Sequence, residues 1–209
     1  MNIQNMGIIE RKERERQEVR SLILEAAQQA FIEDGYEKAS IRAIADRVEY
    51  SPATIYLYFK DKNEIFFAVH ELGFEKLILE MSDAIEGIKN PLEKLRQQGY
   101  AYMKFALENP AMYDLMFIQN APMEAIFDNE EWACGHRCFE LICTIVQECI
   151  DNKLIKISGL ELATMSIWSF MHGLVSLKIR NRFKMFPQEH IQQLMSASVE
   201  QMIELIQHD

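Results

Sequence analysis

The chain has 209 residues, a net charge of −10 and 49% apolar residues. This length allows one or two compact domains with a sizeable core, while no apolar run reaches the length of a membrane span. The charged N-terminus lacks the apolar stretch of a signal peptide, so we expect a cytoplasmic protein with no membrane partner.

Helical spacing and helix-start signals recur along the whole chain, and they predict an all-α protein with about nine helices. A charged extension, residues 1–16, precedes a long helix expected from Gln17 to Asp34 and ended by Gly35. Later helix starts are predicted at Asp61 with Glu64, Asn90-Pro91, Asn109-Pro110, Asp128 with Glu131, Ser158 with Glu161, and Pro187. We therefore expect an N-terminal three-helix domain, residues 1–62, and a larger helical bundle, residues 63–209.

Two short helices around a tight turn are predicted after Ser40. Ser40 is a good N-cap, and the apolar residues that follow it at helical spacing form an inner face. Ser51 caps the second helix and Pro52 takes its first position, while Ile55 and Phe59 point to the core. This layout is typical of a helix-turn-helix DNA reader, although a helical hairpin that binds nothing has the same spacing.

The charge of the N-terminal part does not by itself favour nucleic acid. Residues 1–62 contain ten Lys and Arg against eleven Asp and Glu, whereas residues 63–209 contain twelve against twenty-one. An overall basic domain is the usual electrostatic footprint of a DNA-binding protein. Its absence leaves an alternative, a helical ligand- or protein-binding adaptor that has lost affinity for DNA.

The segment from about Val19 to Glu64 resembles the N-terminal domain of the TetR family of bacterial transcriptional regulators. The matching positions are Ala26, Ala27, Phe31, Gly35-Tyr36, Ser40-Ile41-Arg42-x-Ile44-Ala45 and Ser51-x-Ala53-Thr54-Ile55-Tyr56-x-Tyr58-Phe59-x-x-Lys62. The family often has Gly in the turn where this chain has Glu49, and a positive φ there would cost Glu roughly 1 kcal/mol relative to Gly. The resemblance implies a homodimer that binds a palindromic operator and represses transcription until a small molecule releases it.

Within the reader, we expect the outer residues to divide between base edges and phosphate oxygens. The residues expected at base edges are Pro52, Ala53, Thr54 and Leu57. The residues expected at phosphates are Ser40, Arg42, Ser51, Tyr56, Tyr58, Lys60 and Lys62, although Arg42 could instead reach a base. The basic residues from Arg11 to Arg16 could touch DNA too, but interleaved acids favour a solvated helix.

A second resemblance covers part of residues 63–209. The sequences Asn109-Pro110-Ala111-Met112-Tyr113-x-Leu115-Met116-Phe117 and Trp168-x-x-x-His172-Gly173-Leu174 are similar to the ligand-binding domain of the TetR subgroup named for its Trp-His-Gly signature. The resemblance implies a small-molecule effector, which we expect to be largely apolar. The residues expected to bind it are Tyr102, Phe105, Met112, Tyr113, Met116, Phe117, Met123, Phe139, Trp168 and His172.

An ordinary core is the alternative for each of these residues. For Trp168 and His172, one helical turn apart, packing against each other is the favoured interpretation, with Gly173 permitting close helix contact. Buried acids in this acidic domain would favour a lipophilic cation as the effector.

The last two long helices contain more apolar residues than one helix pair needs to bury. We therefore expect them to form a two-fold four-helix bundle in a homodimer. The residues expected at this interface are Leu162, Met165, Leu177, Ile191, Leu194, Met195 and Met202.

We expect no enzyme activity, no cofactor and no metal. The eight glycines form no phosphate-loop pattern, and no His-Glu-x-x-His or Glu-x-x-His motif occurs. Cys134, Cys138, Cys143 and Cys149 fall in one predicted helix, with His136 on a different face from the first two, so no ligand set converges. We interpret them as small apolar residues in a reducing cytosol, with a redox switch as the alternative.

Overall fold

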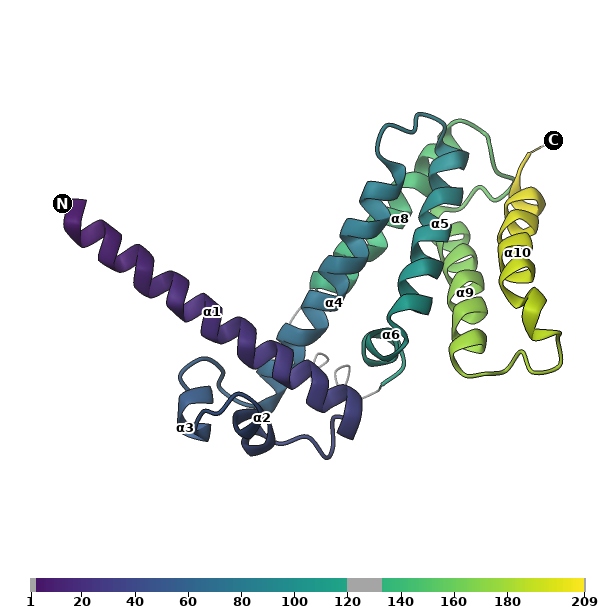
Figure 1. Cartoon of the computed structure of the whole chain (residues 1–209). Helices are drawn as coiled ribbons and strands as arrows, with labels where there is room; N and C mark the ends of the chain where they lie inside the picture. The colour runs from purple at the N-terminus through teal and green to yellow at the C-terminus, as the bar shows by residue number, and fades with distance from the viewer. Residues whose placement is uncertain (1–2, 120–132, 209) are drawn as a thin grey trace. The chain divides into compact units, whose positions relative to one another are not determined.

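The computed structural model describes residues 3–119 and 133–208 (Figure 1). Within these residues it contains nine α-helices and one short 3-10 helix, and the β-type pairing there is limited to an isolated bridge between Ile155 and Gln207. The predicted all-α fold is therefore confirmed. No helix of the described chain combines the length and the apolar character needed to cross a membrane.

Contacts divide the chain into two compact units. Unit 1 comprises Met1–Leu72 with Leu115–Glu131, and unit 2 comprises Gly73–Asp114 with Trp132–Asp209. The division between Leu72 and Gly73 falls inside the fourth helix. From sequence, the domain boundary is expected between residues 62 and 63, at the start of that helix.

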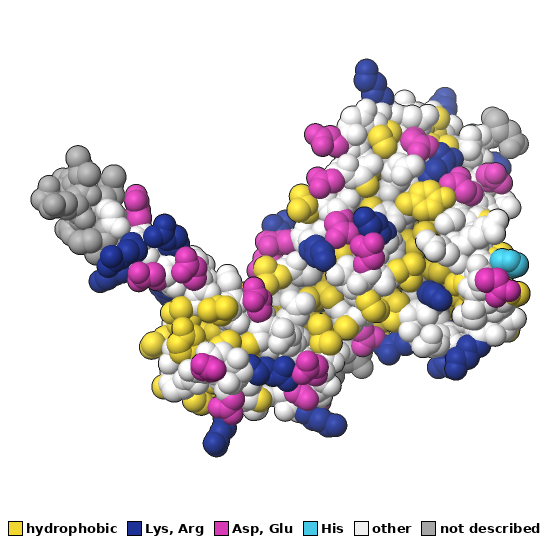
Figure 2. All heavy atoms as spheres, in the orientation of Figure 1, with side chains coloured by type: hydrophobic (Ala, Val, Ile, Leu, Met, Phe, Trp, Pro, Cys, Tyr) yellow, Lys and Arg dark blue, Asp and Glu magenta, His cyan; other side chains and the backbone are white. Residues whose placement is uncertain are grey.

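Unit 1 begins with α1 (Ile3–Asp34), which starts well before the predicted Gln17. The charged extension continues the same helix because it is rich in Arg, Glu and Lys, which are good helix formers. Two i,i+4 ion pairs add weak support, Arg11–Glu15 at 3.5 Å and Arg14–Glu18 at 4.0 Å. Figure 2 shows basic and acidic side chains interleaved along this part of α1, as expected for a solvated helix.

The helix-turn-helix consists of α2 (Ile41–Arg47) and α3 (Pro52–Ile55), and both helices start at the predicted caps. The Oγ atoms of Ser40 and Ser51 each accept a hydrogen bond from the backbone N–H three residues later, at 3.1 and 3.2 Å. In the turn between the helices, Glu49 has a φ of 58°. Glu49 thus has the left-handed conformation that the sequence left open, at the position where the family often has Gly.

The helices of unit 1 share one apolar core, which includes Ile23, Ala27, Phe31, Ile44, Ile55, Phe59, Ile65 and Phe66. The predicted capping box opens α4 (Lys62–Ile85). The Asp61 carboxylate accepts from the backbone N–H of Glu64 at 2.9 Å, and the Glu64 carboxylate accepts from the backbone N–H of Lys60. These caps fix the start of α4 directly after the reader.

Unit 2 is a helical bundle. It contains the second half of α4 together with α5 (Pro91–Glu108), most of α6 (Pro110–Phe117), α8 (Ala133–Asp151), α9 (Leu160–Ile179) and α10 (Ile191–Ile206). The helix α5 packs against α8, α9 and α10, and α8 packs against α9 (Figure 1).

Two predicted helix starts in unit 2 need correction. The capping box at Ser158 is wrong, because Gly159 is the N-cap of α9 and makes no side-chain cap. The helix predicted from Pro187 begins as a 3-10 turn, Gln188–His190, before α10 starts. Asp128 and Glu131 lie outside the described residues.

Candidate nucleic-acid interface and effector cavity

The residues predicted to contact bases share the outer face of α3 and the turn that follows it. Leu57 is 74% exposed, Pro52 and Ala53 are exposed as well, and Thr54 is half-buried. Behind them, Ile55 and Phe59 are fully or almost fully buried. The core thus holds this short helix from the inside and leaves its outer face free.

The Thr54 hydroxyl takes part in the cap of α3. Its Oγ1 lies 3.0 Å from Ser51 Oγ, which also accepts from the Thr54 backbone N–H. A hydroxyl offers one donor and two acceptor lone pairs, so this bond leaves Thr54 capacity for a further partner. The cap also fixes the side-chain rotamer in which Thr54 would meet DNA.

Most of the residues predicted to contact phosphates are open to solvent. Ser40, Arg42, Ser51, Tyr56 and Lys60 are exposed, and Tyr58 is half-buried. In the described part of the chain, no ion pair engages the Arg42 guanidinium or the Lys60 ammonium. Both cations are therefore available to a phosphate backbone.

Lys62 differs from the other predicted phosphate contacts. Its Nζ donates to the backbone carbonyl of Tyr36 at 2.9 Å and lies 4.1 Å from the centre of the Tyr36 ring. The Tyr36 hydroxyl in turn donates to Asn63 Oδ1, and burial raises the pKa of Tyr36. Lys62 thus ties the loop after α1 to the start of α4, and a phosphate contact would compete with this bond.

A small cavity of about 20 Å³ lies within unit 2, and residues of α4, α5, α8, α9 and α10 line it. Its wall consists of Met, Leu and Ile side chains, Gly99, and three polar residues, Gln98, Tyr102 and Trp168. Two of these, Tyr102 and Trp168, were predicted to bind an effector. No charged side chain lines the cavity.

A buried hydrogen-bond network continues from Tyr102. The Tyr113 hydroxyl lies 2.6 Å from His172 Nδ1, and the Tyr102 hydroxyl lies 3.0 Å from the Tyr113 hydroxyl and 3.3 Å from His172 Nδ1. Burial raises the pKa of both phenols and lowers the pKa of His172. The network is therefore uncharged at neutral pH, with the imidazole in its neutral form.

The predicted packing of Trp168 against His172 is confirmed. Their ring centres lie 5.9 Å apart, and Phe139 makes an edge-to-face contact with Trp168, with ring centres 6.1 Å apart. Gly173, however, has no neighbour within 4 Å of an added Cβ. Its expected role in close helix contact is therefore wrong within this chain.

The other predicted effector residues do not meet at the cavity. Phe105 and Met112 are buried elsewhere in unit 2, whereas Met116 and Phe117 belong to unit 1. Met123 lies outside the described residues.

The buried polar side chains are His70, Gln98 and Thr164 among the residues that the structure describes. The expected buried acids are therefore absent from this set, and no buried carboxylate there favours a lipophilic cation. Gln98 itself was missed from sequence, although it is in helical register with the buried residues Leu95 and Tyr102.

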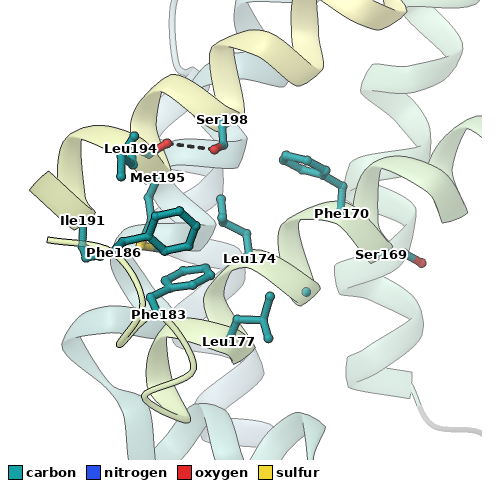
Figure 3. Close-up of a pocket in the computed structure, with 11 residues that line it drawn as sticks. Ser169, Phe170, Leu174, Leu177, Phe183, Phe186, Ile191, Leu194, Met195 and Ser198 are labelled. Atoms are coloured by element: carbon teal, nitrogen blue, oxygen red, sulfur yellow. Dashed lines mark hydrogen bonds between the residues drawn. The ribbon is translucent and has the colours of Figure 1, made fainter. Parts of the chain in front are cut away.

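An apolar groove of about 420 Å³ lies between α9 and α10 (Figure 3). Aromatic and aliphatic side chains line most of it, including Phe170, Leu174, Leu177, Phe183, Phe186 and Leu194. Figure 3 shows the Phe183 and Phe186 rings, from the loop before α10, close together at one side of the groove.

The residues predicted at a dimer interface divide into two sets. Leu162, Met165, Leu177 and Leu194 are exposed, and the first two are more than 60% exposed. Ile191, Met195 and Met202 are buried within the single chain. The first two also line the groove, whereas Met202 lines the internal cavity. Met202 is thus a core residue rather than a surface that a partner could cover.

The cysteines fit the predicted structural role. Cys134, Cys138 and Cys149 are buried and Cys143 is half-buried, and none forms a disulfide. Burial raises the pKa of Cys138 to about 12 and that of Cys149 to about 11, which disfavours the reactive thiolate. The described residues contain no cluster of three or more potential metal ligands.

Two family matches cover most of this architecture. Residues 23–69 match the family described as bacterial regulatory proteins, tetR family, and residues 95–204 match the tetracyclin repressor-like C-terminal domain. The uncharacterized HTH-type transcriptional regulator YobS of Bacillus subtilis is 23% identical over 180 residues, 85% of this chain and 87% of that protein. The HTH-type transcriptional activator FasR of Mycolicibacterium smegmatis is 29% identical over 131 residues, 61% of this chain and 60% of that protein.

Solved structures have the same fold at low sequence identity. The fatty acid degradation regulator FadR from Bacillus halodurans superposes with a TM-score of 0.71 at 16% identity, covering 89% of this chain and 93% of that chain. A TetR family transcription regulator from Marinobacter aquaeolei superposes with a TM-score of 0.69 at 21% identity, covering 94% of this chain and all (100%) of that one.

Proposed function

We propose that this chain, which belongs to the TetR family of bacterial regulatory proteins, is a dimeric repressor that a small, largely apolar effector releases from a palindromic operator. Family membership makes the chain a DNA-binding transcriptional regulator. The single observation that carries the DNA-reading role is the exposed outer surface of α3 and of the turn after it, where Leu57 is exposed and the buried Ile55 and Phe59 hold the segment from inside. Small residues at the start of such a helix permit close approach to base edges in a major groove.

The support for a dimer is the apolar surface of α9 and α10. Monomeric proteins rarely leave a large contiguous apolar patch in water, and the groove, which the exposed Leu177 and Leu194 line, forms part of such a patch. A second copy related by a two-fold axis would cover it and bury the exposed Leu162 and Met165. Gly173, which lines the groove without a side chain, would then permit close approach of the partner's helix.

Release by an effector is supported by the helices α4 and α6, each of which has residues in both units. A molecule that changes the packing of these helices in unit 2 would therefore act on unit 1 through a continuous backbone. The coupling is reciprocal, so operator DNA must weaken effector binding by the same factor as the effector weakens operator binding.

Repression and subgroup are part of this proposal. FasR is named an activator, so whether this chain represses or activates transcription needs its own test.

We assign the chain to the Trp-His-Gly subgroup because Trp168 packs against His172 and Gly173 follows directly. The protein would act in the cytoplasm, where its operator lies.

A selection of bound sequences from random duplex DNA tests the proposal. We expect purified protein at moderate salt to enrich a palindrome whose half-sites lie about one helical turn apart. Transcription in vitro from a promoter that carries the palindrome should fall when the protein is added. A selection without enrichment, repeated after denaturing and refolding to strip any bound molecule, would instead support the adaptor that has lost DNA affinity.

A further inference from the structure

We infer that the side-chain amide of Gln98 recognises the effector, and that the effector is an uncharged, slender apolar molecule with a carbonyl oxygen, as in a ketone, an ester or an amide. This inference rests on the proposed function, because it presupposes that unit 2 takes an effector. It adds the chemical class of that effector and the residue that selects it.

The first observation is an unsatisfied donor inside the bundle. Gln98 is only 3% exposed, and its Nε2 has no hydrogen-bond partner among the described residues. Buried polar groups are nearly always paired, and leaving one unpaired costs its full desolvation free energy. An amide N–H requires an acceptor, and a carbonyl oxygen is the acceptor it most often meets in proteins.

A second unsatisfied group lies on a neighbouring helix. Thr164 on α9 is fully buried, and its Oγ1 also has no partner in the described part of the chain. It precedes Ile167 and Trp168 by three and four residues, so it lies on the same face of α9 as these two cavity-lining residues. Two adjacent, packed helices, α5 and α9, therefore each carry an unsatisfied polar group on their inward faces.

The wall of the cavity determines the charge of what can enter. Gln98 lines the cavity, and no Asp, Glu, Lys or Arg does. Burying a carboxylate or an ammonium group without a partner of opposite charge is strongly unfavourable. The neighbouring Tyr102 hydroxyl is already within hydrogen-bond distance of Tyr113 and His172, and the Trp168 side chain hydrogen-bonds to Tyr102. The Gln98 amide is therefore left as the donor for a neutral oxygen.

The size of the cavity determines the shape of what can enter. Its volume of about 20 Å³ holds roughly one water molecule, so a larger molecule must displace side chains. Met81, Met171 and Met202 line it, and unbranched Met side chains adjust readily. A Cβ added at Gly99 would lie 3.7 Å from Met171 and Val199, at ordinary van der Waals distance, so the Met171 side chain packs directly against the backbone at Gly99. A slender chain fits such a slot better than a bulky ring system.

The test compares four small probes with similar apolar bodies, namely 2-octanone, 1-octene, octanoate and octyltrimethylammonium. Binding is followed by tryptophan fluorescence, since Trp168 lines the cavity. Gln98→Met replaces the amide by an apolar side chain of similar length. We expect the ratio of ketone to alkene affinity to fall at least about tenfold from the unaltered protein to Gln98→Met.

The matched control is Leu95→Met, which alters the same wall at nearly constant volume and should leave the ketone-to-alkene ratio unchanged. Gln98→Met should unfold at the same or a higher temperature than the unaltered protein, because it removes an unsatisfied buried amide. In the unaltered protein, both charged probes should bind more weakly than the ketone. That comparison does not depend on the folding of any variant.

Three results would overturn the inference: a ketone-to-alkene ratio that Gln98→Met leaves unchanged, tighter binding of octanoate or of the ammonium probe than of the ketone, or no binding of 2-octanone up to its solubility. The last result would mean that the amide holds only a water molecule. Operator affinity of the unaltered protein, measured without any probe, separates the two proposals, because binding of the selected palindrome tests the proposed function independently of the probes. Failure of the unaltered protein to bind any palindrome contradicts the proposed function, whatever the probes show.

Discussion

At the scale of single residues, Glu49 occupies a backbone conformation that L-residues avoid. Its φ of 58° lies in the left-handed region, where a Cβ costs about 1–2 kcal/mol. The helix-turn-helix needs this conformation to redirect the chain from α2 to α3. The strain is therefore a local cost of the turn, which the surrounding core offsets.

Glu49→Gly should raise the free energy of unfolding by about 0.5–1 kcal/mol, because the relief of strain exceeds the entropy that Gly adds to the unfolded chain. Urea denaturation measures it. Glu25→Gly is the matched control, since Glu25 is exposed in the middle of α1 and Gly there should lower stability by about 1 kcal/mol. Equal losses in both variants would show that the turn does not favour Gly.

Two lysines at the end of the reader are expected to have different roles. Lys60→Ala should lower the slope of log affinity against log salt by about two units for a dimer, since it removes one phosphate contact from each of the two copies. Lys62→Ala should mainly lower stability, because it breaks the bond to the Tyr36 carbonyl. Salt titrations and urea denaturation of both variants separate the roles. A lower salt slope for Lys62→Ala at unchanged stability would assign Lys62 to the phosphates instead.

Two histidines are expected to make the free energy of unfolding decrease at acidic pH. His70 is fully buried with its Nε2 3.1 Å from the Met116 carbonyl oxygen, and burial lowers the pKa of both His70 and His172. A His with a lowered folded pKa binds fewer protons in the folded state, so stability is complete above pH ~6.5 and falls as the pH decreases through the folded pKa.

Urea denaturation between pH 7.5 and 5, compared for the unaltered protein and His70→Gln, measures this dependence. We expect a smaller loss of stability on acidification in the variant. His136→Gln is the control, because His136 is exposed on α8 and its loss should leave the pH profile unchanged. Identical profiles for His70→Gln and the unaltered protein would contradict a buried, neutral His70.

At the scale of elements, the helices with side-chain caps were predictable from sequence. Ser40, Ser51 and the pair Asp61 and Glu64 all cap as expected, since each supplies a side-chain oxygen to an otherwise unpaired N–H. The start of α9 was not predictable in this way, because Gly159 takes the cap position and supplies no side chain. The sequence therefore predicts the start of a helix where a side chain caps it, and misses the start where only the backbone does.

The candidate sites were predictable to different degrees. The outer face of α3 followed from helical spacing, because the buried Ile55 and Phe59 identify the opposite side. The internal cavity did not, because a glutamine in a helix is usually solvated, and Gln98 is identified as buried only by its register with Leu95 and Tyr102. Pairing between α5, α6 and α9 depends on tertiary packing that local periodicity does not encode.

If the exposed apolar surface of α9 and α10 forms the proposed dimer interface, a charged side chain placed in its groove should weaken the dimer. Leu177 lines the groove and is 45% exposed. Leu177→Glu should shift the protein from dimer toward monomer in sedimentation velocity, with the dissociation constant rising roughly tenfold to a hundredfold because a carboxylate would be buried unpaired. Leu79→Glu should leave the dimer intact, since Leu79 is exposed on α4 outside the groove. A dimer that tolerates Leu177→Glu would place the interface elsewhere.

At the scale of the whole molecule, charge and function are distributed unequally between the parts of the chain. Residues 1–62 are nearly neutral, whereas residues 63–209 carry almost all of the excess acid. Phosphates repel an acidic surface, so we expect operator binding to depend on the few cations beside the reader, such as Arg42 and Lys60. The account therefore predicts a salt dependence that is real but modest for a DNA-binding dimer.

Two copies of this chain are expected to bind one palindrome together, and a titration of the protein into that DNA measures whether they do. Fluorescence anisotropy of the selected palindrome should show two chains per duplex and an affinity that falls with rising salt. A duplex with one half-site scrambled should bind at least tenfold more weakly. Equal affinity for the palindrome, the half-site and unrelated DNA would contradict the account.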